Sequence, residues 1–230
     1  MIIMKDVRKK YGDFEFQMSL EIPDGRITGL VGKNGAGKST AIKLLLGLAK
    51  PDAGEIRILG SEGKELPVSV KQEIGASLAE SGFCSQFTVD DAKHILARMY
   101  PAFDRDFFER QCRELKLPEK KKIKEFSTGM KAKLRVLTAI THNAKLLILD
   151  EPTAALDPIA EAQIYENFNE MVKNKTAIYI SHRMSSCKFC DRIIVLDSGR
   201  FAEAGTHETL MRQEGIYYAL YEAQAKHYAE

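Results

Sequence analysis

The sequence lacks any apolar run long enough to cross a membrane. Its longest runs, Leu44–Leu46 and Leu146–Leu149, fit a core helix and a core strand, whereas a spanning helix needs about 20 apolar residues. The first residues, Met1–Asp6, contain no apolar stretch of the length found in signal peptides. We therefore expect neither a membrane span nor a secretory leader, and we predict a cytoplasmic protein.

A strong charge of either sign is also missing. The 230 residues carry a net charge of +2, which gives no bulk electrostatic reason to expect nucleic acid as a partner. One short basic cluster, Lys120–Lys122 with Lys124, is typical of a solvated loop or helix face, and a nucleic-acid contact is the less favoured alternative. We predict no nucleic-acid partner.

Cysteine is scarce and scattered, with four residues in the chain. Cys187 and Cys190 have C-x-x-C spacing, but a zinc site needs a second pair of ligands and none follows that pattern. Reduced thiols packed on a helix are the favoured interpretation. Internal repeats and low-complexity segments are absent too. A chain of this length buries enough surface to fold without a disulfide or metal staple.

What the sequence does contain is a complete phosphate-binding loop (P-loop), Gly32–Ser39, spelled G-x-x-x-x-G-K-S. Its glycines let consecutive backbone N–H groups point at an anion, and Lys38 would reach the β- and γ-phosphates. The Ser39 hydroxyl would ligate Mg²⁺. A buried strand is expected at 26–31 and a helix at 40–46, which is the context that the motif requires. The residues predicted to bind phosphate are Asn34, Gly35, Ala36, Gly37, Lys38, Ser39 and Thr40.

The remaining segments predict an α/β protein. Residues 1–30 alternate apolar and polar, with turn breaks at 12–13 and 23–25, as in an antiparallel β start. Helical spacing over 88–141, broken at Pro101 and Pro118, indicates an inserted helical subdomain. Further strands are expected at 56–59, 74–78, 145–150, 177–180 and 193–196, and further helices at 158–172 and from 207 onward. We predict one domain over 1–230: a P-loop NTPase core with an antiparallel β subdomain (1–87 and 142–230) and an α-helical insertion (88–141).

Two acidic residues, Asp150 and Glu151, end the apolar strand at 145–150. An acid at the tip of a buried strand in a P-loop enzyme can hold Mg²⁺ through water, and Asp150 fits that role. Glu151 is placed to act as the general base on the attacking water. The alternative is a pair of exposed acids at a strand end, which the preceding P-loop makes less favoured.

Before that strand, Phe126–Lys131 precedes a helix at 132–140, with Ser127 as a possible helix cap and Gly129 permitting close backbone approach. With P-loop, capped helix and acidic strand in this order, the chain resembles the ATP-binding subunits of ABC transporters. Ser127–Lys131 stands where that family has its signature L-S-G-G-Q. The serine and second glycine, which the family uses on the γ-phosphate, are kept, while Phe126, Thr128 and Met130-Lys131 depart from it.

The resemblance implies further site residues. Tyr11 matches the aromatic that stacks on adenine, although a strand-edge tyrosine is an alternative. Residues 154–157 look like the D-loop, so Asp157 would lie at the dimer interface, and His182 looks like the switch histidine that senses the γ-phosphate. The glutamine expected after the strand at 74–78 is missing. Glu80 is the candidate replacement as a magnesium ligand, with Ala79 as the alternative and Gln86 too late in the loop.

The family resemblance also implies partners. Two copies, or this chain and a paralogue, would close head to tail on ATP and Mg²⁺ and drive a separate transmembrane permease at the inner face of the membrane. Three other classes remain as alternatives: an ABC ATPase in translation or DNA repair, a nucleotide-binding module without hydrolysis, and a kinase or GTPase. Glu151 and His182 argue against the second, and the lack of a second-substrate or guanine-specific element argues against the third.

The two halves of the chain resemble different branches of the family. Up to about Asp150 the chain is similar to ATPases encoded apart from their membrane subunits, as in bacterial drug and antimicrobial-peptide exporters. From Thr153 onward it is similar to ATPase domains fused to membrane helices, notably at 181–186, 190–193, 205–208 and 215–217. A natural lineage with mixed features is favoured over a recombined or engineered mosaic. Because the helical subdomain contacts the membrane subunit in this family, we expect the first half to choose the partner.

Overall fold

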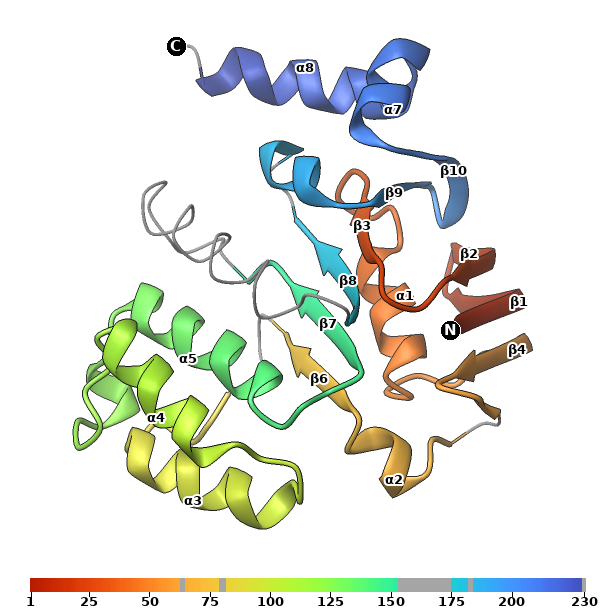
Figure 1. Ribbon diagram of the computed structural model, residues 1–230. Helices are drawn as coiled ribbons and strands as arrows, with labels where there is room; N and C mark the ends of the chain where they lie inside the picture. Colours follow the sequence, from red (N-terminus) through yellow and green to blue (C-terminus); the bar gives the residue numbers. More distant parts are fainter. Residues whose placement is uncertain (63–64, 79–81, 153–174, 182–183, 229–230) are drawn as a thin grey trace. The chain divides into compact units, whose positions relative to one another are not determined.

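The computed structural model describes residues 1–62, 65–78, 82–152, 175–181 and 184–228 (Figure 1). These residues fall into two compact units. The first contains Met1–Lys71 and Thr176–Glu230, and the second contains Gln72–Lys175. The helix expected at 158–172 and the D-loop expected at 154–157 lie outside the described residues.

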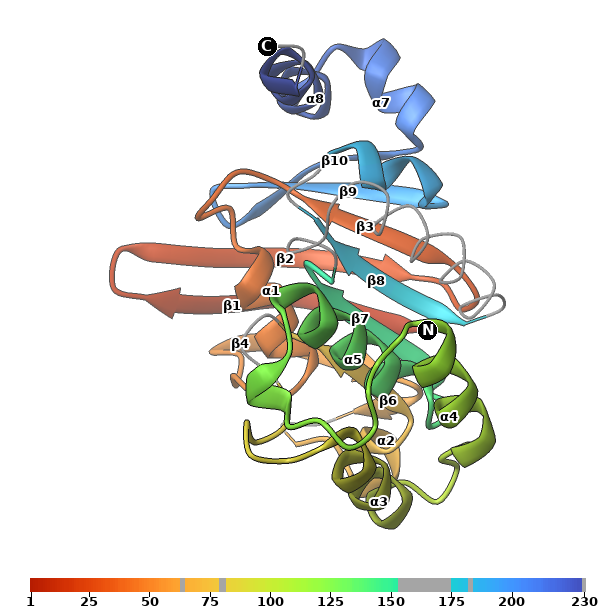
Figure 2. The ribbon, with the colours of Figure 1, turned by 90° about the vertical axis from the view of Figure 1, so that its left-hand side faces the viewer.

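The first unit begins with a long antiparallel ribbon, formed by β1 (Ile2–Tyr11) and β2 (Phe14–Ile22) (Figure 2). Alternate apolar side chains of both strands turn to the core, as the period of two in the sequence requires. The other edge of β1 pairs antiparallel with β4 (Ala53–Ile58), which continues through a tight turn into β5 (Ser61–Glu62).

A bulge interrupts β1, where the register shifts between Met4 and Val7. Asp6 lies in the left-handed region, with φ of 49°, and its carbonyl approaches Gly54 on β4. A Cβ built on Gly54 would lie under 3.0 Å from the Asp6 carbonyl oxygen. Only glycine therefore fits opposite the bulge.

The strand that leads into the P-loop is buried in a parallel part of the sheet. This strand, β3 (Ile27–Val31), is parallel to β8 (Thr176–Ile180) on one side and β9 (Arg192–Asp197) on the other. β9 turns back into the antiparallel β10 (Arg200–Gly205), which pairs with β2. The strand order in this unit is β5-β4-β1-β2-β10-β9-β3-β8.

Helices complete the first unit. They are α1 (Lys38–Leu45), α2 (Val68–Lys71), the short 3₁₀ helix η2 (Met184–Phe189), α7 (His207–Gln213) and α8 (Ile216–Tyr228). The Glu203 carboxylate accepts hydrogen bonds from the backbone N–H groups of Ile216 (2.6 Å) and Tyr217 (3.1 Å). An acid at a helix N-terminus satisfies otherwise unpaired donors, so β10 anchors the start of α8.

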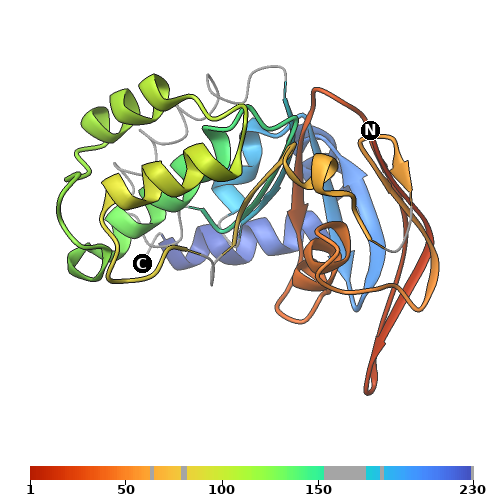
Figure 3. The same cartoon turned by 90° about the horizontal axis from the view of Figure 1, so that it is seen from below.

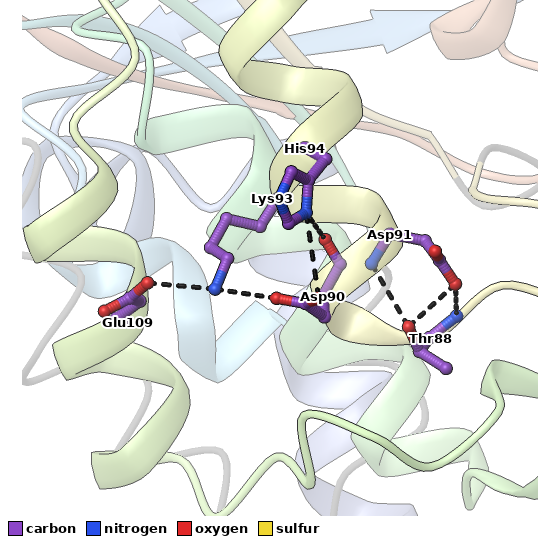
Figure 4. A network of polar contacts seen from close by, with 6 residues as sticks. All are labelled: Thr88, Asp90, Asp91, Lys93, His94 and Glu109. Atoms are coloured by element: carbon purple, nitrogen blue, oxygen red, sulfur yellow. Dashed lines mark hydrogen bonds and ion pairs between the residues drawn. The ribbon is translucent and has the colours of Figure 1, made fainter.

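The second unit packs helices beside two parallel strands, β6 (Ile74–Ser77) and β7 (Leu146–Asp150). Its helices are α3 (Val89–Met99), α4 (Arg105–Glu114), η1 (Ile123–Glu125) and α5 (Thr128–Ile140) (Figure 3). Each of the three long helices starts at a side chain that accepts a hydrogen bond from the first turn: Thr88, Asp104 and Ser127. Lys93 on α3 forms an ion pair with Glu109 on α4 (2.9 Å), which ties the two helices together, and another with Asp90 of its own helix (2.8 Å) (Figure 4).

The α/β class and the expected strands and helices of the described residues are confirmed, with bounds shifted by a few residues. The strand β10 was not expected, because its residues Arg200–Gly205 are mostly exposed or half-buried and show no clear apolar period. The two compact units divide the chain at 71/72 and 175/176. The expected helical insertion at 88–141 stays a prediction.

Candidate functional site

The P-loop connects β3 to α1 in the first unit. Gly35 and Gly37 have φ of 80° and 102°, values that L side chains rarely adopt, so the loop needs glycine at both positions. The tip, Lys33 to Gly35, is exposed, while Ala36 and Gly37 are buried. The loop therefore presents its backbone to solvent on one side and is packed into the unit on the other.

Lys38 is folded over this loop. Lys38 is only 7% exposed. Its Nζ donates hydrogen bonds to the carbonyl oxygens of Gly32 (2.7 Å) and Lys33 (3.0 Å). A cation held inside a curl of backbone next to the start of a helix is the arrangement that binds phosphate. The hydroxyl of Ser39 is on an exposed residue at the start of α1, where an oxygen ligand suits Mg²⁺.

Aromatic residues of the β1–β2 hairpin lie beside the P-loop. Phe14 and Phe16 on β2 approach Gly37, since a Cβ built there would lie 3.0 Å from Phe16 Cδ2 and 3.4 Å from Phe14 Cζ. Tyr11 pairs with Phe14 across the hairpin and is 45% exposed. The Lys9 ammonium lies 5.5 Å from the Tyr11 ring centroid. This hairpin places an exposed ring near the loop, as stacking on a nucleotide base would require.

The acidic residues belong to the second unit. Leu146 to Leu149 of β7 are completely buried, and Asp150 and Glu151 follow where the strand ends. Glu151 has φ of 48°, although it is not glycine and precedes Pro152, which restricts its backbone further. Such strain costs about 1–3 kcal/mol and is typical of functional positions. Asp6, Lys116 and Asn143 also have positive φ, so the strain alone assigns no role to Glu151, and its role as general base stays a prediction.

The signature-like segment caps α5 in the same unit. Ser127 Oγ accepts a hydrogen bond from the backbone N–H of Met130 at 3.2 Å, so the cap expected from the sequence is present. Phe126, only 4% exposed, fixes the approach to the helix, while Ser127 itself is exposed and Gly129 half-buried. The segment thus presents a hydroxyl and a helix N-terminus at the surface.

Several expected site residues lie outside the described residues: Glu80 with its alternative Ala79, Asp157 and His182. Their roles stay predictions. Within the part of the chain that the structure describes, no group of three or more histidine, cysteine or acidic side chains could hold a metal by itself. Ser39 and Asp150, the remaining expected magnesium ligands, belong to different units and offer the hard oxygen atoms that Mg²⁺ prefers.

Three of the four cysteines are packed in the interior. None of the four forms a disulfide; Cys84 is exposed and the other three are buried. Burial raises the pKa of the Cys187 thiol to about 12 and also raises the pKa of Cys190. The favoured interpretation of the C-x-x-C spacing as reduced, packed thiols therefore agrees with the structure. Among the described residues, no helix combines the length and the apolar character needed to cross a membrane.

The sequence analysis missed residues that support the P-loop from β9 and β10. A Cβ built on Gly32 would lie under 3.0 Å from the Leu196 carbonyl oxygen, and the backbone N–H of Gly199 donates to the Ala36 carbonyl at 3.1 Å. The only sequence signal was a turn-forming Ser-Gly pair at 198–199. No local sequence pattern connects that pair to a loop more than 150 residues earlier.

Known proteins are similar to this chain over most of its length. The bacitracin transport ATP-binding protein of Enterococcus faecalis is 35% identical over 210 residues, which cover 88% of this chain and 68% of that protein. Nod factor export ATP-binding protein I of Burkholderia orbicola is 32% identical over 222 residues, covering 93% and 73%. Three other curated relatives are longer, and the chain spans 34% to 40% of their length.

A solved structure of a bacterial Atm1-family ABC exporter with ATP bound superposes with a TM-score of 0.85 and 27% identity, over 97% of this chain and 42% of that one. The ABC transporter family itself matches residues 16–154, which include the P-loop, the signature-like segment and both acids at the end of β7. The chain therefore belongs to the ABC transporter family, as an ATP-binding ATPase cassette.

Proposed function

We propose that this chain is the ATPase subunit of an exporter and that it works as a dimer on a separate transmembrane permease at the cytoplasmic face of the membrane. Relatives named for bacitracin transport and Nod factor export support an export role. The P-loop is the main observation behind the proposal. The Lys38 ammonium lies beside two loop carbonyls, where the negative charge of a phosphate would balance its positive charge. The partner ATPase would be a second copy or a paralogue.

Each ATP would lie between the P-loop of one subunit and Ser127 and Gly129 of the other. In the first unit, residues Asn34–Thr40 would bind the phosphates and Tyr11 would stack on adenine. Mg²⁺ would neutralise phosphate charge, held by Ser39, Asp150 and Glu80. Positioning and electrostatics supply most of the rate enhancement in phosphoryl transfer.

The residues at the end of β7 would carry the chemical step. Glu151 would take the proton from the attacking water, and its strained backbone would fix the carboxylate direction in advance. His182 would contact the γ-phosphate and Asp157 would cross the dimer interface, as the family pattern implies. Hydrolysis would remove the shared γ-phosphate contacts and so release the dimer.

The permease would dock on the helices of the second unit. A cavity of about 590 Å³ opens there, lined by α5, by the end of α3 and by residues 82–85. Its wall combines exposed Met99 with the cationic side chains Lys131 and Arg135. Arg135 Nη1 also donates to the Leu78 carbonyl at 3.3 Å, immediately before the segment that contains Glu80. An amphipathic helix with an acidic side chain would match this wall.

ATP hydrolysis measured against protein concentration tests the catalytic proposal. We expect activity to rise more than linearly with concentration, because two subunits must meet to complete each site. Glu151→Gln should be inactive, with a loss of at least about 10²-fold in kcat, and should accumulate as an ATP-bound dimer detectable by size-exclusion chromatography. Linear activity, or a normal rate for the variant, would exclude this mechanism.

Copurification with the permease tests the docking proposal. Met99→Glu should weaken assembly and transport-coupled hydrolysis, because it puts an acid into the apolar part of the cavity wall. Val68→Glu is the matched control, since Val68 is another exposed apolar residue, 70% exposed against 56% for Met99, in the first unit. Equal assembly of the two variants would place the permease elsewhere.

A further inference from the structure

The turn between β9 and β10 is hydrogen-bonded to the P-loop. The backbone N–H of Gly199 donates to the Ala36 carbonyl at 3.1 Å, and the Gly199 carbonyl accepts from the Gln17 N–H at 2.8 Å. Gly199 is buried, although it lies in a hairpin turn. One residue thus joins the P-loop to β2 through its two backbone polar groups.

The shape of the turn leaves these groups available. Asp197 and Arg200 pair across the hairpin, and between them Ser198 and Gly199 have φ of 48° and 78°. Two successive left-handed residues are the mark of a type I′ turn. The hydrogen bond that closes such a turn joins its first and fourth residues, so the amide and carbonyl of Gly199 can serve neighbouring segments.

Space around the turn admits no side chain. A Cβ built on Gly199 would lie under 3.0 Å from the Glu15 carbonyl oxygen. In the P-loop, a Cβ on Gly37 would lie 3.4 Å from Gly199 Cα, and one on Gly32 would lie under 3.0 Å from the Leu196 carbonyl oxygen. Both ends of the loop therefore pack against the backbone of the β9–β10 hairpin.

We propose that Gly199 is a positioning residue for nucleotide binding, because it holds the P-loop in its anion-binding shape before the nucleotide arrives. The hydrogen bond to Ala36 acts on the residue that precedes Gly37, whose left-handed backbone turns the loop into α1. A loop that is already ordered loses less conformational entropy on binding, which strengthens affinity. The inference rests on the proposed nucleotide binding by this loop, and it requires no contact between Gly199 and the nucleotide.

The chain contains a matched control for this residue. Leu59 and Gly60 form the turn between β4 and β5, with φ of 51° and 79°, and Ile58 pairs with Ser61 across it. The backbone is therefore nearly the same as at Ser198 and Gly199. Gly60 is exposed, and a Cβ built on it meets nothing within 4 Å. Alanine at either position carries the same left-handed strain. Only at Gly199 would the added Cβ also meet the Glu15 carbonyl of β2, so that the turn has to shift and its hydrogen bond to the P-loop is disturbed.

Titration of the full chain with fluorescent ADP and ATP analogues in the presence of Mg²⁺ tests the proposal. Gly199→Ala should raise Kd by about tenfold, the scale of one lost hydrogen bond, whereas Gly60→Ala should leave it unchanged. In steady-state hydrolysis the variant should raise KM more than it lowers kcat, because the loop binds the phosphates in both ground and transition states. Thermal unfolding of both variants measures the shared strain separately.

Equal Kd values for the two variants, with the wild type binding normally, would overturn the role of Gly199. Failure of the wild type and of Gly60→Ala to bind nucleotide would instead overturn the proposed function. Amide hydrogen exchange on the wild type covers the case in which Gly199→Ala does not fold. The Gly199 amide should exchange more slowly than the Gly60 amide and slow further with Mg-ADP. Equal exchange of the two amides, unaffected by nucleotide, would contradict the proposal.

Discussion

In the first unit the P-loop takes its shape from residues far away in the sequence, whereas in the second unit the segment at Ser127 takes its shape from its own neighbours. The P-loop packs on the Leu196 carbonyl of β9 and on aromatic rings of β2. Ser127, by contrast, caps α5 through the N–H of Met130, three residues on. The two segments that we propose lie on either side of one ATP are therefore supported in opposite ways.

This difference predicts how each segment responds to substitution. A loop held by distant backbone loses its shape when one close approach is blocked, because glycine backbone and carbonyl oxygens cannot move aside easily. A helix cap loses one hydrogen bond and leaves the rest of the helix in place. Substitutions at the packed glycines of the P-loop should accordingly weaken nucleotide binding. Substitutions at the Ser127 cap should mainly lower the stability of α5.

The largest effect is expected for Gly32→Ala. A Cβ there would lie under 3.0 Å from the Leu196 carbonyl oxygen and 2.9 Å from Ala36 Cβ, so the P-loop must move off β9. Strain of about 3 kcal/mol that is relieved only by distorting the loop corresponds to a loss of affinity of about a hundredfold. Titration with a fluorescent ATP analogue measures the loss.

Gly47→Ala is the control for that variant, since Gly47 also has a positive φ, 68°, and a Cβ built on it meets nothing within 4 Å. Its Kd should stay within about twofold of the wild-type value, while its stability falls through backbone strain alone. If both variants bind nucleotide equally well, distant packing does not shape the P-loop and the comparison fails.

The same contrast decides what could be predicted from the sequence. The P-loop, the acidic strand end and the Ser127 cap are local patterns, and the strand before the P-loop, the strand β7 and the cap are present as expected. The helix after Ser127 begins at Thr128, earlier than the expected start at 132. The hairpin at Ser198 and Gly199 supports the P-loop from another part of the chain, and no local pattern indicates which turn will meet which loop. The positive φ of Glu151 could not be predicted from the sequence either, because it depends on the packing around the strand end and not on residue type.

A smaller effect is expected for Ser127→Ala. Loss of the cap should lower the free energy of unfolding by about 1 kcal/mol. Thr88→Ala removes an equivalent cap from α3, where Thr88 Oγ1 accepts from the Asp91 N–H at 3.1 Å and Asp91 accepts from the Thr88 N–H at 2.8 Å (Figure 4). Chemical denaturation should give similar losses for both variants.

Enzyme assays distinguish the role proposed for Ser127 in ATP hydrolysis from the purely structural role of Thr88. Because Ser127 is proposed to contact the nucleotide of the opposite subunit, Ser127→Ala should also lower kcat for ATP hydrolysis at concentrations where dimers form. Thr88→Ala should keep kcat near the wild-type value, and the P-loop of both variants should bind ADP normally. A matching fall in kcat for the two variants would show that Ser127 acts through helix stability alone.

The smallest effect is expected on the pH dependence of stability, at His142. This residue connects segments of the second unit that are far apart in the sequence. Its ring nitrogens contact the carbonyl oxygens of Thr138 (3.3 Å) and Ile74 (3.2 Å), and its ring stacks on Tyr100 with centroids 4.1 Å apart. The side chain therefore ties the end of α5 to β6. Burial lowers the pKa of His142, and the charge of Lys175 lowers it further, against the two carbonyl contacts that raise it.

In the unfolded chain His142 has an ordinary pKa of about 6.5 and takes up a proton below that pH. In the folded chain its pKa is lower, so it stays neutral there. Stability should be level above about pH 6.5 and should fall as the pH drops below it, because the unfolded state then binds more protons. His142→Gln should lessen that fall, at about 1.4 kcal/mol for each pKa unit of difference. Denaturation curves between pH 5 and pH 8 compare His142→Gln with the wild type. An undiminished pH dependence in His142→Gln would mean that the burial of His142 between α5 and β6 does not cause the fall in stability.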